Sequence, residues 1–179
     1  MNGTRAVRVA HTAQLVAAEL AAIRALLYDV FDDMTEDDYE HALGGMHALA
    51  WDGAELVGHG SVVMRRLLHD GRALRTGYVE GVAVRADRRR RGIGGALMAD
   101  LESVIVGAYD IGALGATDEA VEFYADRGWQ PWSGTASVVT PGGTVREPDV
   151  EDCIFLLSGA ADLPTAGDLA CDWRGGDAW

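Results

Sequence analysis

The sequence contains no lysine, and all 15 of its basic residues are arginines. A nucleotide-binding P-loop requires Gly-Lys followed by Ser or Thr, so the sequence excludes this class of site. The 28 aspartates and glutamates give a formal net charge of −13. A chain this acidic repels nucleic acid over most of its surface, so we expect no nucleic-acid partner. The arginine run at 88–91 therefore predicts a local site for an anionic cofactor, beside a cationic substrate.

Cysteine and histidine are too few and too scattered for a metal centre. Cys153 and Cys171 lack the spacing of a metal or redox motif, and two free thiols are typical of a reducing cytosol. None of the five histidines has the spacing of an H-x-x-x-H motif. We predict no metal site, expect both cysteines to pack rather than react, and interpret His41 and His47 as structural.

Long hydrophobic runs are also missing. No stretch approaches the length of a membrane span, and the N-terminal MNGTRAVRVAHTA lacks the apolar core of a signal peptide. We therefore expect a cytoplasmic protein without a membrane partner. A length of 179 residues with 49% hydrophobic residues suits one domain spanning residues 1–179.

The N-terminal third has the pattern of one strand and two helices. Residues 6–10 alternate and predict a strand. Apolar residues at 16–30 recur every three or four positions and predict an amphipathic helix, with Thr12 as its N-cap. Thr35 is expected to cap a short second helix that reaches about Leu43.

The middle of the chain predicts antiparallel strands. Asp52-Gly53 and Asp70-Gly71 separate extended runs, and Asp-Gly between such runs is a strong hairpin signal. We expect a three-stranded meander whose last strand contains Glu80. Glu80 shares its parity with apolar neighbours, which is an unusual place for a carboxylate.

The remaining third alternates between helices and strands. We predict a helix at 92–107, a strand at 111–114, a helix capped by Thr117 and stopped by Gly128, a strand over 129–132 and 136–139, another at 153–157, and a loop at 141–152. The tail at about 159–179 ends in CDWRGGDAW, which is too aromatic for a floppy terminus. We expect it to dock, held by Trp173 and its neighbours.

The stretch GYVEGVAVRADRRRRGIGG, at 77–95, organises these elements. Its Arg89, Gly92 and Gly94 fit the pattern R-x-x-G-x-G at the start of a helix. A helix N-terminus carries a partial positive charge and unpaired N–H groups, and glycine lets a phosphate approach the main chain. The pattern therefore indicates a pyrophosphate site.

A strand, then R-x-x-G-x-G, then a helix resembles the acetyl-CoA site of the GNAT family of N-acetyltransferases. The segments EHALGGMHA (40–48), GYVEGVAVR (77–85), YADRGW (124–129) and CDWRGGDAW (171–179) resemble more specifically the aminoglycoside 2'-N-acetyltransferases. The element order matches the GNAT fold over nearly the whole chain. This resemblance implies an α/β (α+β) protein with a mixed, mostly antiparallel central sheet flanked by helices.

The resemblance also implies an activity. The protein would transfer the acetyl group of acetyl-CoA to the 2'-amino group of aminoglycoside antibiotics, by direct attack in a ternary complex, and so confer resistance. It would act as a homodimer and need no metal. Another aminosugar such as kasugamycin, a polyamine or a small cellular amine stays open as an alternative substrate.

The resemblance assigns the cofactor and catalytic residues position by position. Glu80 would act as base through a water molecule, and Tyr124 would be the general acid for the departing thiolate. The main chain at Val82, Ala83 and Val84 would contact the pantetheine arm. The pyrophosphate would be held by Arg89, Arg90, Arg91, Gly92, Ile93 and Gly94.

Binding of a polycationic substrate calls for carboxylates from several segments. The residues expected to contact substrate are Asp33, Asp38, Glu80, Gly81, Gly115, Asp149, Asp177 and the terminal carboxylate of Trp179. Asp32 is an alternative to Asp33. The register of the acidic stretch at 149–152 is open.

Overall fold

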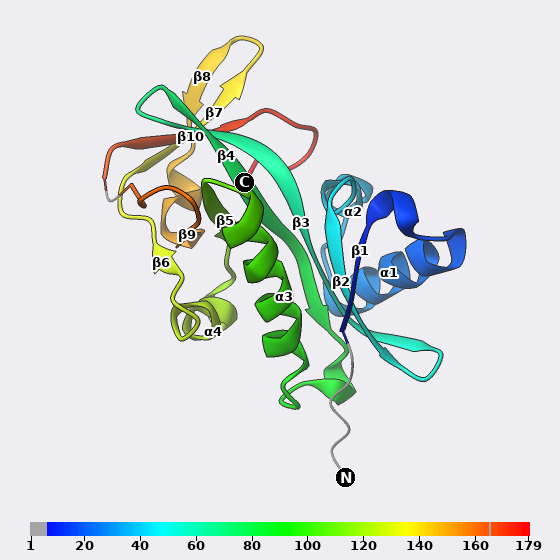
Figure 1. The fold of residues 1–179 in the computed structure, drawn as a ribbon. Coiled ribbons are helices and arrows are strands. Elements are labelled where there is room, and N and C mark those ends of the chain that lie inside the picture. Colours follow the sequence, from blue (N-terminus) through cyan, green and yellow to red (C-terminus); the bar gives the residue numbers. More distant parts are fainter. Residues whose placement is uncertain (1–6, 165) are drawn as a thin grey trace. The chain divides into compact units, whose positions relative to one another are not determined.

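The protein was analysed as a computed structural model that describes residues 7–164 and 166–179 (Figure 1). It divides into two compact units. Unit 1 comprises the described residues of Met1–Val63 together with Val79–Val104, and unit 2 comprises Met64–Tyr78 and Ile105–Trp179. A single domain over the whole chain stays a prediction.

Unit 1 contains three antiparallel strands and two helices that cover one of their faces. The elements are β1 (Val7–His11), α1 (Ala17–Val30), α2 (Glu36–His41), β2 (Met46–Asp52) and the first part of β3 (Glu55–His69). It also holds the second part of β4 (Arg72–Val84) and most of α3 (Ile93–Ala108). Ile23 and Leu27 of α1 pack with Leu49 of β2 and Ala83 of β4 in one buried cluster. Helices α1 and α2 therefore share a core with the sheet.

Helix α3 packs against β3 at two glycines. A Cβ atom at Gly58 would lie 2.7 Å from Ile93 Cγ2, and one at Gly60 would lie 2.9 Å from Leu101 Cδ1. Real Cβ contacts are not this short, so glycine is needed here for the helix to approach the strand.

The predicted N-cap of the long helix is wrong. Helix α1 begins at Ala17 with Val16 as its N-cap, and Thr12 instead starts a short 3-10 helix that His11 caps. The Thr12 hydroxyl accepts from the N–H of Gly44 at 2.8 Å and lies 2.7 Å from Nε2 of His47. A long-range polar contact has therefore taken the group that would cap a helix.

The second helix follows its prediction. Thr35 accepts from the N–H of Asp38 at 3.2 Å, and the Asp38 carboxylate accepts from the N–H of Thr35 at 2.8 Å. This reciprocal pair is a capping box, which pairs two N–H groups that the helix itself cannot satisfy.

The predicted meander is confirmed by β2, β3 and β4. Asp70 and Gly71, between β3 and β4, have φ of 47° and 82°. Positive φ at both central residues is the two-residue turn whose twist matches that of the flanking strands.

Unit 2 is built on a mixed sheet. Its strand order is β6-β9-β5-β4-β3-β10-β7-β8, in which β3 and β4 contribute Met64–His69 and Arg72–Tyr78. The elements not yet given are β5 (Ile111–Gly115), α4 (Val121–Ala125), β6 (Gln130–Pro131), β7 (Thr135–Thr140), β8 (Gly143–Arg146), β9 (Ile154–Ser158) and β10 (Asp168–Asp172). β5 is parallel to β4 and β10 is parallel to β7, whereas β9, β8 and the β10–β3 pair are antiparallel. The expected mixed, mostly antiparallel sheet is confirmed.

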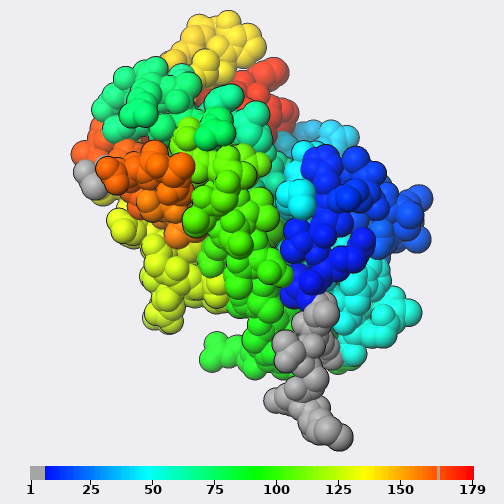
Figure 2. Space-filling view, viewed as in Figure 1, coloured from blue at the N-terminus to red at the C-terminus, as the bar shows by residue number. Residues whose placement is uncertain are grey.

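Two segments of unit 2 differ from their predictions. The expected loop at 141–152 contains β8, whose four residues are all exposed at the surface, followed by a 3-10 helix at Pro148–Cys153 (Figure 2). The expected strand over Trp129–Trp132 is reduced to the two residues of β6. A short exposed strand lacks the apolar alternation from which strands are predicted.

The tail contributes a strand rather than a surface contact. β10 lies between β3 and β7, and Leu169 and Cys171 are fully buried there. The buried Arg65 donates from Nε to the Asp172 carboxylate and from Nη2 to the Asp172 carbonyl, both at 2.8 Å. Trp173 is 58% exposed, so the prediction that it holds the tail is wrong.

The space around two glycines predicts that alanine substitutions have opposite effects on stability. A Cβ atom at Gly45 would lie 2.0 Å from the carbonyl oxygen of Val62, whereas one at Gly107 would meet nothing within 4 Å. Gly45→Ala should lower the free energy of unfolding by about 1–3 kcal/mol, as overpacking does. Gly107→Ala should raise it by up to about 1 kcal/mol, because alanine favours a helix. Urea denaturation of both variants measures this, and equal effects would contradict the glycine packing.

Candidate functional site

The connection from β4 to α3 has the geometry of an anion-binding loop. Arg90 and Gly92 adopt left-handed conformations, with φ of 60° and 78°. Ala96 N–H donates to the Gly92 carbonyl at 3.0 Å, so the helix begins directly after Gly92. The N–H groups of its first turn have no acceptor within the helix. A Cβ atom at Gly92 would meet nothing within 4 Å, so the approach to these donors is open.

The arginines of this connection have two different roles. Arg85 pairs with Glu55 and Asp87, and Arg88 pairs with Asp52 and Asp87. Hydrogen bonds from Arg85 lower the pKa of Asp87 to about 2, so this carboxylate stays charged. These pairs fix the connection to β2 and β3.

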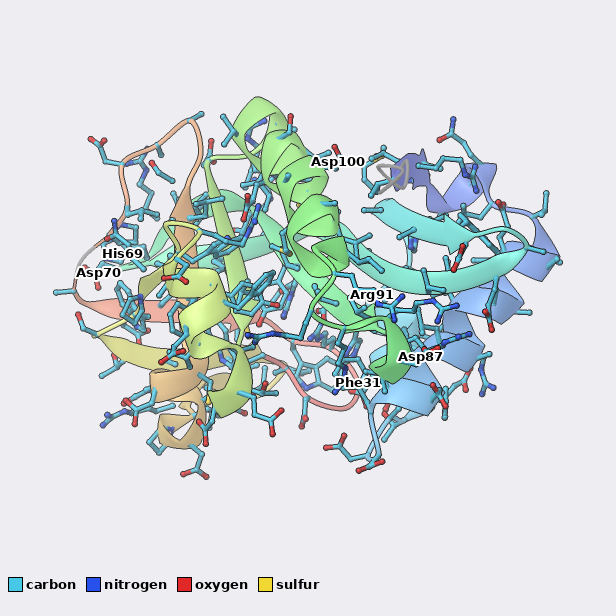
Figure 3. The ribbon with its side chains drawn as sticks, turned by 90° about the horizontal axis from the view of Figure 1, so that it is seen from below. Phe31, His69, Asp70, Asp87, Arg91 and Asp100 are labelled. Carbon is cyan, nitrogen blue, oxygen red and sulfur yellow. The ribbon has the colours of Figure 1, made fainter. Side chains whose placement is uncertain are left out.

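The other three arginines lie exposed after this anchor. Arg89 donates from Nε to the Val84 carbonyl at 3.2 Å. Within the part of the chain that the structure describes, Arg90 and Arg91 form no ion pair. Figure 3 labels Asp87 and Arg91 on this connection. The guanidinium groups predicted to hold a pyrophosphate are therefore not neutralised by the carboxylates that hold Arg85 and Arg88.

Glu80 precedes a break in β4. Gly81 has φ of 56°, which is left-handed and unlike regular strand backbone. A Cβ atom at Gly81 would lie 3.4 Å from Leu27 and 3.5 Å from Ala42, so this residue faces α1 and the end of α2. The carbonyl of Glu80 accepts from Ser61 Oγ at 3.4 Å, and Glu80 itself is half-buried. The alternation predicted through Glu80 did not reveal this irregularity.

A buried chain of polar side chains ends at Gly81. His59 Nδ1 lies 2.8 Å from the Gly81 carbonyl, His47 Nδ1 lies 2.9 Å from His59 Nε2, and Thr12 Oγ1 lies 2.7 Å from His47 Nε2. A carbonyl only accepts, so His59 must donate from Nδ1 and accept at Nε2. His47 then donates from Nδ1 and accepts from Thr12. One direction of donation is fixed from His47 to the Gly81 carbonyl, whereas the Thr12 hydroxyl has the Gly45 carbonyl, at 3.3 Å, as a second acceptor.

Both histidines are neutral in this setting. Burial lowers the pKa of His47 to about 4 and that of His59 to about 3. The interpretation of His47 as structural agrees with these contacts. His59 was missed by sequence reasoning, because its partners come from residues 12 and 22 positions away.

Tyr124 lies in unit 2, on α4. Its side chain is 7% exposed, and its ring centroid lies 5.2 Å from that of Phe123 and 6.1 Å from that of Trp129. Gly128, with φ of 90°, follows the helix as predicted. Gly115 ends β5 in the same unit, and a Cβ atom there would lie 3.8 Å from the Tyr78 hydroxyl.

The acidic residues of unit 1 lie at the start of α2 and in the turn before it. Asp32 and Asp33 are both exposed in this turn, so the choice between them stays open. Asp38 also accepts from the Thr35 hydroxyl at 2.6 Å, in addition to its backbone bond. Its carboxylate thus has a local structural role, and its contact with substrate stays a prediction.

In the acidic stretch at 149–152 of unit 2, not every carboxylate is available to contact a ligand. Glu151 accepts from the Ala136 N–H at 3.1 Å and from Arg146 at 2.9 Å, and hydrogen bonds to Arg146 and Ala136 lower its pKa. Glu151 therefore ties the 3-10 helix to β7 and β8. Asp149 and Asp152 are exposed, so they are the candidates for contacting a ligand.

The last residues fold back on β10. Cys171 Sγ donates to the Ala178 carbonyl at 3.4 Å, and Arg174 Nε donates to the Asp177 carbonyl at 2.9 Å. Trp179 Nε1 is buried and has no hydrogen-bond partner among the described residues. Burial raises the pKa of Cys171 to about 11, so its thiol is protonated near neutral pH and is a poor nucleophile.

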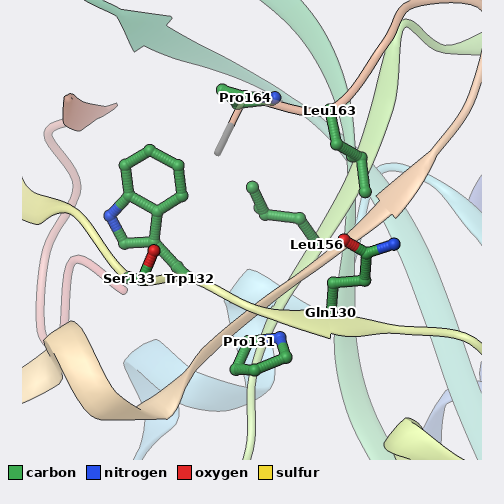
Figure 4. A pocket seen from close by; sticks show the side chains of 7 residues that line it. All are labelled: Gln130, Pro131, Trp132, Ser133, Leu156, Leu163 and Pro164. Carbon is green, nitrogen blue, oxygen red and sulfur yellow. The ribbon is translucent and has the colours of Figure 1, made fainter. Parts of the chain in front are cut away.

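Unit 2 contains a cavity of about 200 Å³ whose lining includes none of the predicted site residues (Figure 4). It is lined by Gln130, Pro131, Trp132, Ser133, Leu156, Leu163 and Pro164. None of these carries a titratable group suited to acid–base chemistry, so we assign it no catalytic role. Among the described residues, no group of three or more His, Cys, Asp or Glu is arranged to hold a metal. No described helix is both long and apolar enough to cross a membrane.

The model of the acetyltransferase (GNAT) family matches residues 15–129. The chain belongs to the GNAT family. An aminoglycoside 2'-N-acetyltransferase of Mycolicibacterium fortuitum is 43% identical to this GNAT chain over 177 residues, which cover 96% of the chain and 91% of the relative. The resemblance found in the sequence is thereby confirmed.

Solved GNAT structures share the fold. The GNAT family N-acetyltransferase YhbS of Escherichia coli, in complex with CoA, gives a TM-score of 0.62 at 15% identity, over 96% of this chain and 92% of that one. A GNAT acetyltransferase of Brucella melitensis, in complex with acetyl-CoA, gives 0.58 at 17% identity, over 96% and 97%. At such identities the comparison establishes the fold alone.

The two buried histidines predict that stability falls in mild acid. Their folded pKa values of about 4 and about 3 lie below the ordinary value of 6.5. The unfolded chain therefore binds protons first as pH drops below 6.5, while stability above 6.5 is unaffected. Each histidine should cost up to about 1.4 kcal/mol per pH unit until its folded pKa is reached.

Urea denaturation between pH 7 and pH 5 measures this loss. His59→Asn should remove about half of the slope, because one of the two titrating groups is gone. His69→Asn is the control, since His69 is partly exposed and belongs to unit 2. An unchanged slope in His59→Asn would contradict a neutral, buried His59.

Proposed function

We propose that this GNAT chain transfers the acetyl group of acetyl-CoA to the 2'-amino group of aminoglycosides, in a ternary complex, and thereby confers resistance. The observation that carries the proposal is the extent of the 43% identity. It covers 96% of the chain, whereas the family model ends at residue 129. The similarity to a 2'-N-acetyltransferase therefore includes the acidic stretch and most of the tail, which lie outside the residues that the family model matches.

The loop before α3 fits the pyrophosphate of acetyl-CoA. Successive main-chain N–H groups around a left-handed residue form a concave anion site, and here they adjoin a helix N-terminus. The open space above Gly92 and the exposed Arg89, Arg90 and Arg91 support this role. Gly94 and Ile93 contribute first-turn N–H groups. Val82, Ala83 and Val84 offer main-chain groups to the pantetheine arm.

The proposed chemistry uses a base and an acid. Acetyl-CoA supplies an acetyl group activated as a thioester. A sugar amine with a pKa of about 8 is mostly protonated at neutral pH, so Glu80 takes its proton through a water molecule. The amine nitrogen then bonds to the acetyl carbon as the carbon–sulfur bond breaks. The Val82 N–H polarises the acetyl carbonyl, and Tyr124 protonates the departing thiolate. The nitrogen loses its extra proton to solvent as the amide forms, and Tyr124 regains a proton from solvent.

Carboxylates bind the cationic substrate in this proposal. Asp33 or Asp32, Asp38, Asp149, Asp177 and Trp179 contribute charge, and Gly81 and Gly115 contribute main-chain contacts. Ion pairs of this kind are worth about 1 kcal/mol each when partly desolvated. We further propose that the protein is a cytoplasmic homodimer.

A matched pair of glycine variants tests the cofactor loop. Gly92 and Gly71 both have positive φ, of 78° and 82°, and a Cβ atom at either would meet nothing within 4 Å. Alanine should therefore strain both turns equally. Gly92→Ala should weaken acetyl-CoA binding about tenfold, a loss of about 1.4 kcal/mol, by placing a methyl group against the phosphate. Gly71→Ala should leave it unchanged. Calorimetry that found equal affinities in the two variants would show that the loop is misassigned.

Glu80→Gln tests the base. The variant keeps the shape of the side chain, so turnover should fall about 10²-fold at neutral pH. Activity should recover partly as pH rises and the amine loses its proton without help. A pH profile of the same shape as that of the unaltered enzyme would make Glu80 a binding residue and not a base.

The substrate is tested by thiol release from acetyl-CoA with a panel of amines. Aminoglycosides with a 2'-amino group should be acetylated, and matched compounds with a 2'-hydroxyl group should not. Acetylation of kasugamycin or a polyamine, without any dependence on the 2'-amine, would support the proposed acetyltransferase activity and contradict the proposed substrate.

A further inference from the structure

Gly81 bends β4 locally, because its left-handed φ of 56° departs from regular strand backbone. The two carbonyl groups at this break receive side-chain donors from β3. Ser61 Oγ donates to the Glu80 carbonyl at 3.4 Å, and His59 Nδ1 donates to the Gly81 carbonyl at 2.8 Å. His59 and Ser61 are two residues apart on one strand, so they project from the same face.

The layer around this break is otherwise apolar and closely packed. His47, His59 and Ser61 are fully buried. Leu27 and Ala42, which a Cβ atom at Gly81 would contact, belong to the buried cluster of α1, α2 and the sheet. A polar chain in such a layer is stable only when every member is paired, and it then specifies one arrangement.

The direction of donation makes this chain of hydrogen-bonded side chains rigid. It begins at the exposed Gly44, whose N–H donates to Thr12, and it passes through His47 and His59 to the Gly81 carbonyl. The low pKa values of both histidines keep them neutral, so neither tautomer changes at neutral pH. The carbonyl at the end is too weak a base to take a proton. This chain of hydrogen bonds therefore fixes the position of the Gly81 carbonyl and does not transfer protons.

We propose that His59, supported by His47 and Thr12, is a positioning residue that holds the bend at Gly81 and so sets where Glu80 and the Val82 N–H stand. This inference rests on the roles proposed above for Glu80 and Val82. The carboxylate is attached one residue before the carbonyl that His59 holds. A shift of the bend therefore displaces the base from the substrate amine and the Val82 N–H from the thioester.

Three variants of His59 separate positioning from packing. His59→Leu removes both ring nitrogens. His59→Asn keeps a nitrogen donor bonded to Cγ, as Nδ1 is, whereas the amide of His59→Gln lies one bond farther out and cannot replace Nδ1. Ile111→Ala is the control for packing, because Ile111 is fully buried on β5 but belongs neither to the polar chain nor to the cluster that contacts Gly81.

The measurements are kcat, KM for both substrates and the pH profile of kcat/KM, each per folded protein. His59→Leu should lower kcat about tenfold or more, since a displaced catalytic group loses attack geometry. Its pH profile should shift, and its KM for acetyl-CoA should stay within about twofold. His59→Asn should restore most of the activity and His59→Gln should not. Ile111→Ala should lose stability without losing kcat.

Two results overturn the proposal. One is an unchanged kcat in His59→Leu. The other is equal impairment of His59→Asn and His59→Gln that follows their loss of stability, which makes His59 a packing residue only. If His59→Leu does not fold, the comparison of Asn with Gln gives the same decision.

A readout without activity distinguishes failure of this proposal from failure of the proposed function. Amide hydrogen exchange over residues 78–84 should be faster in His59→Gln than in His59→Asn, because the bend is released. Equal exchange overturns the positioning role even if the enzyme acetylates aminoglycosides. Faster exchange in an enzyme that acetylates no aminoglycoside supports the role of His59 and contradicts the substrate.

Discussion

Pairing of the carbonyls at Gly81 is the constraint that the rest of unit 1 serves. A left-handed residue within a strand puts its carbonyl out of the regular ladder, and a buried carbonyl left unpaired costs about 1–3 kcal/mol. His59 meets this need from the neighbouring strand. His59 in turn needs a donor for its second nitrogen, which His47 supplies, and His47 needs Thr12. One irregular residue in β4 therefore determines three side chains on other segments.

The arginines of the chain have two different roles. Arg65, Arg85, Arg88 and Arg146 are paired with carboxylates that hold strands and turns together. The exposed arginines at 89–91 follow the anchored ones directly. A guanidinium group cannot lose its charge in a protein, so these side chains keep a local positive field in a chain of net charge −13. The absence of lysine makes this field independent of pH over the range in which enzymes work.

The sequence was sufficient where structure is encoded locally. Asp70-Gly71 specifies its turn by conformation alone, Thr35 and Asp38 form their capping box within one helical turn, and Gly92 marks the start of α3. Thr12 shows where such reasoning fails, because its hydroxyl was available for a cap but bonds to residues more than 30 positions away. The pairing of β10 also depends on residues far away in the sequence. Its partners β3 and β7 are distant in the chain, so its pairing cannot be read from DLACD itself.

The same distinction between local and long-range features applies to the candidate site. Family resemblance supplied Glu80, Tyr124 and the glycine loop because those residues belong to short matching segments. It did not supply His59 or the left-handed conformations of Gly81 and Arg90, which have no motif of their own. Glycine at 81 permits a left-handed bend but does not require it, since glycine adopts strand conformations equally well. What selects the bend is the donor on β3 together with the contact of Gly81 with α1, and both exist only once the sheet and helix have assembled. The predicted site residues therefore belong to short segments of the sequence, whereas the backbone conformation beside Glu80 depends on contacts made by the folded chain.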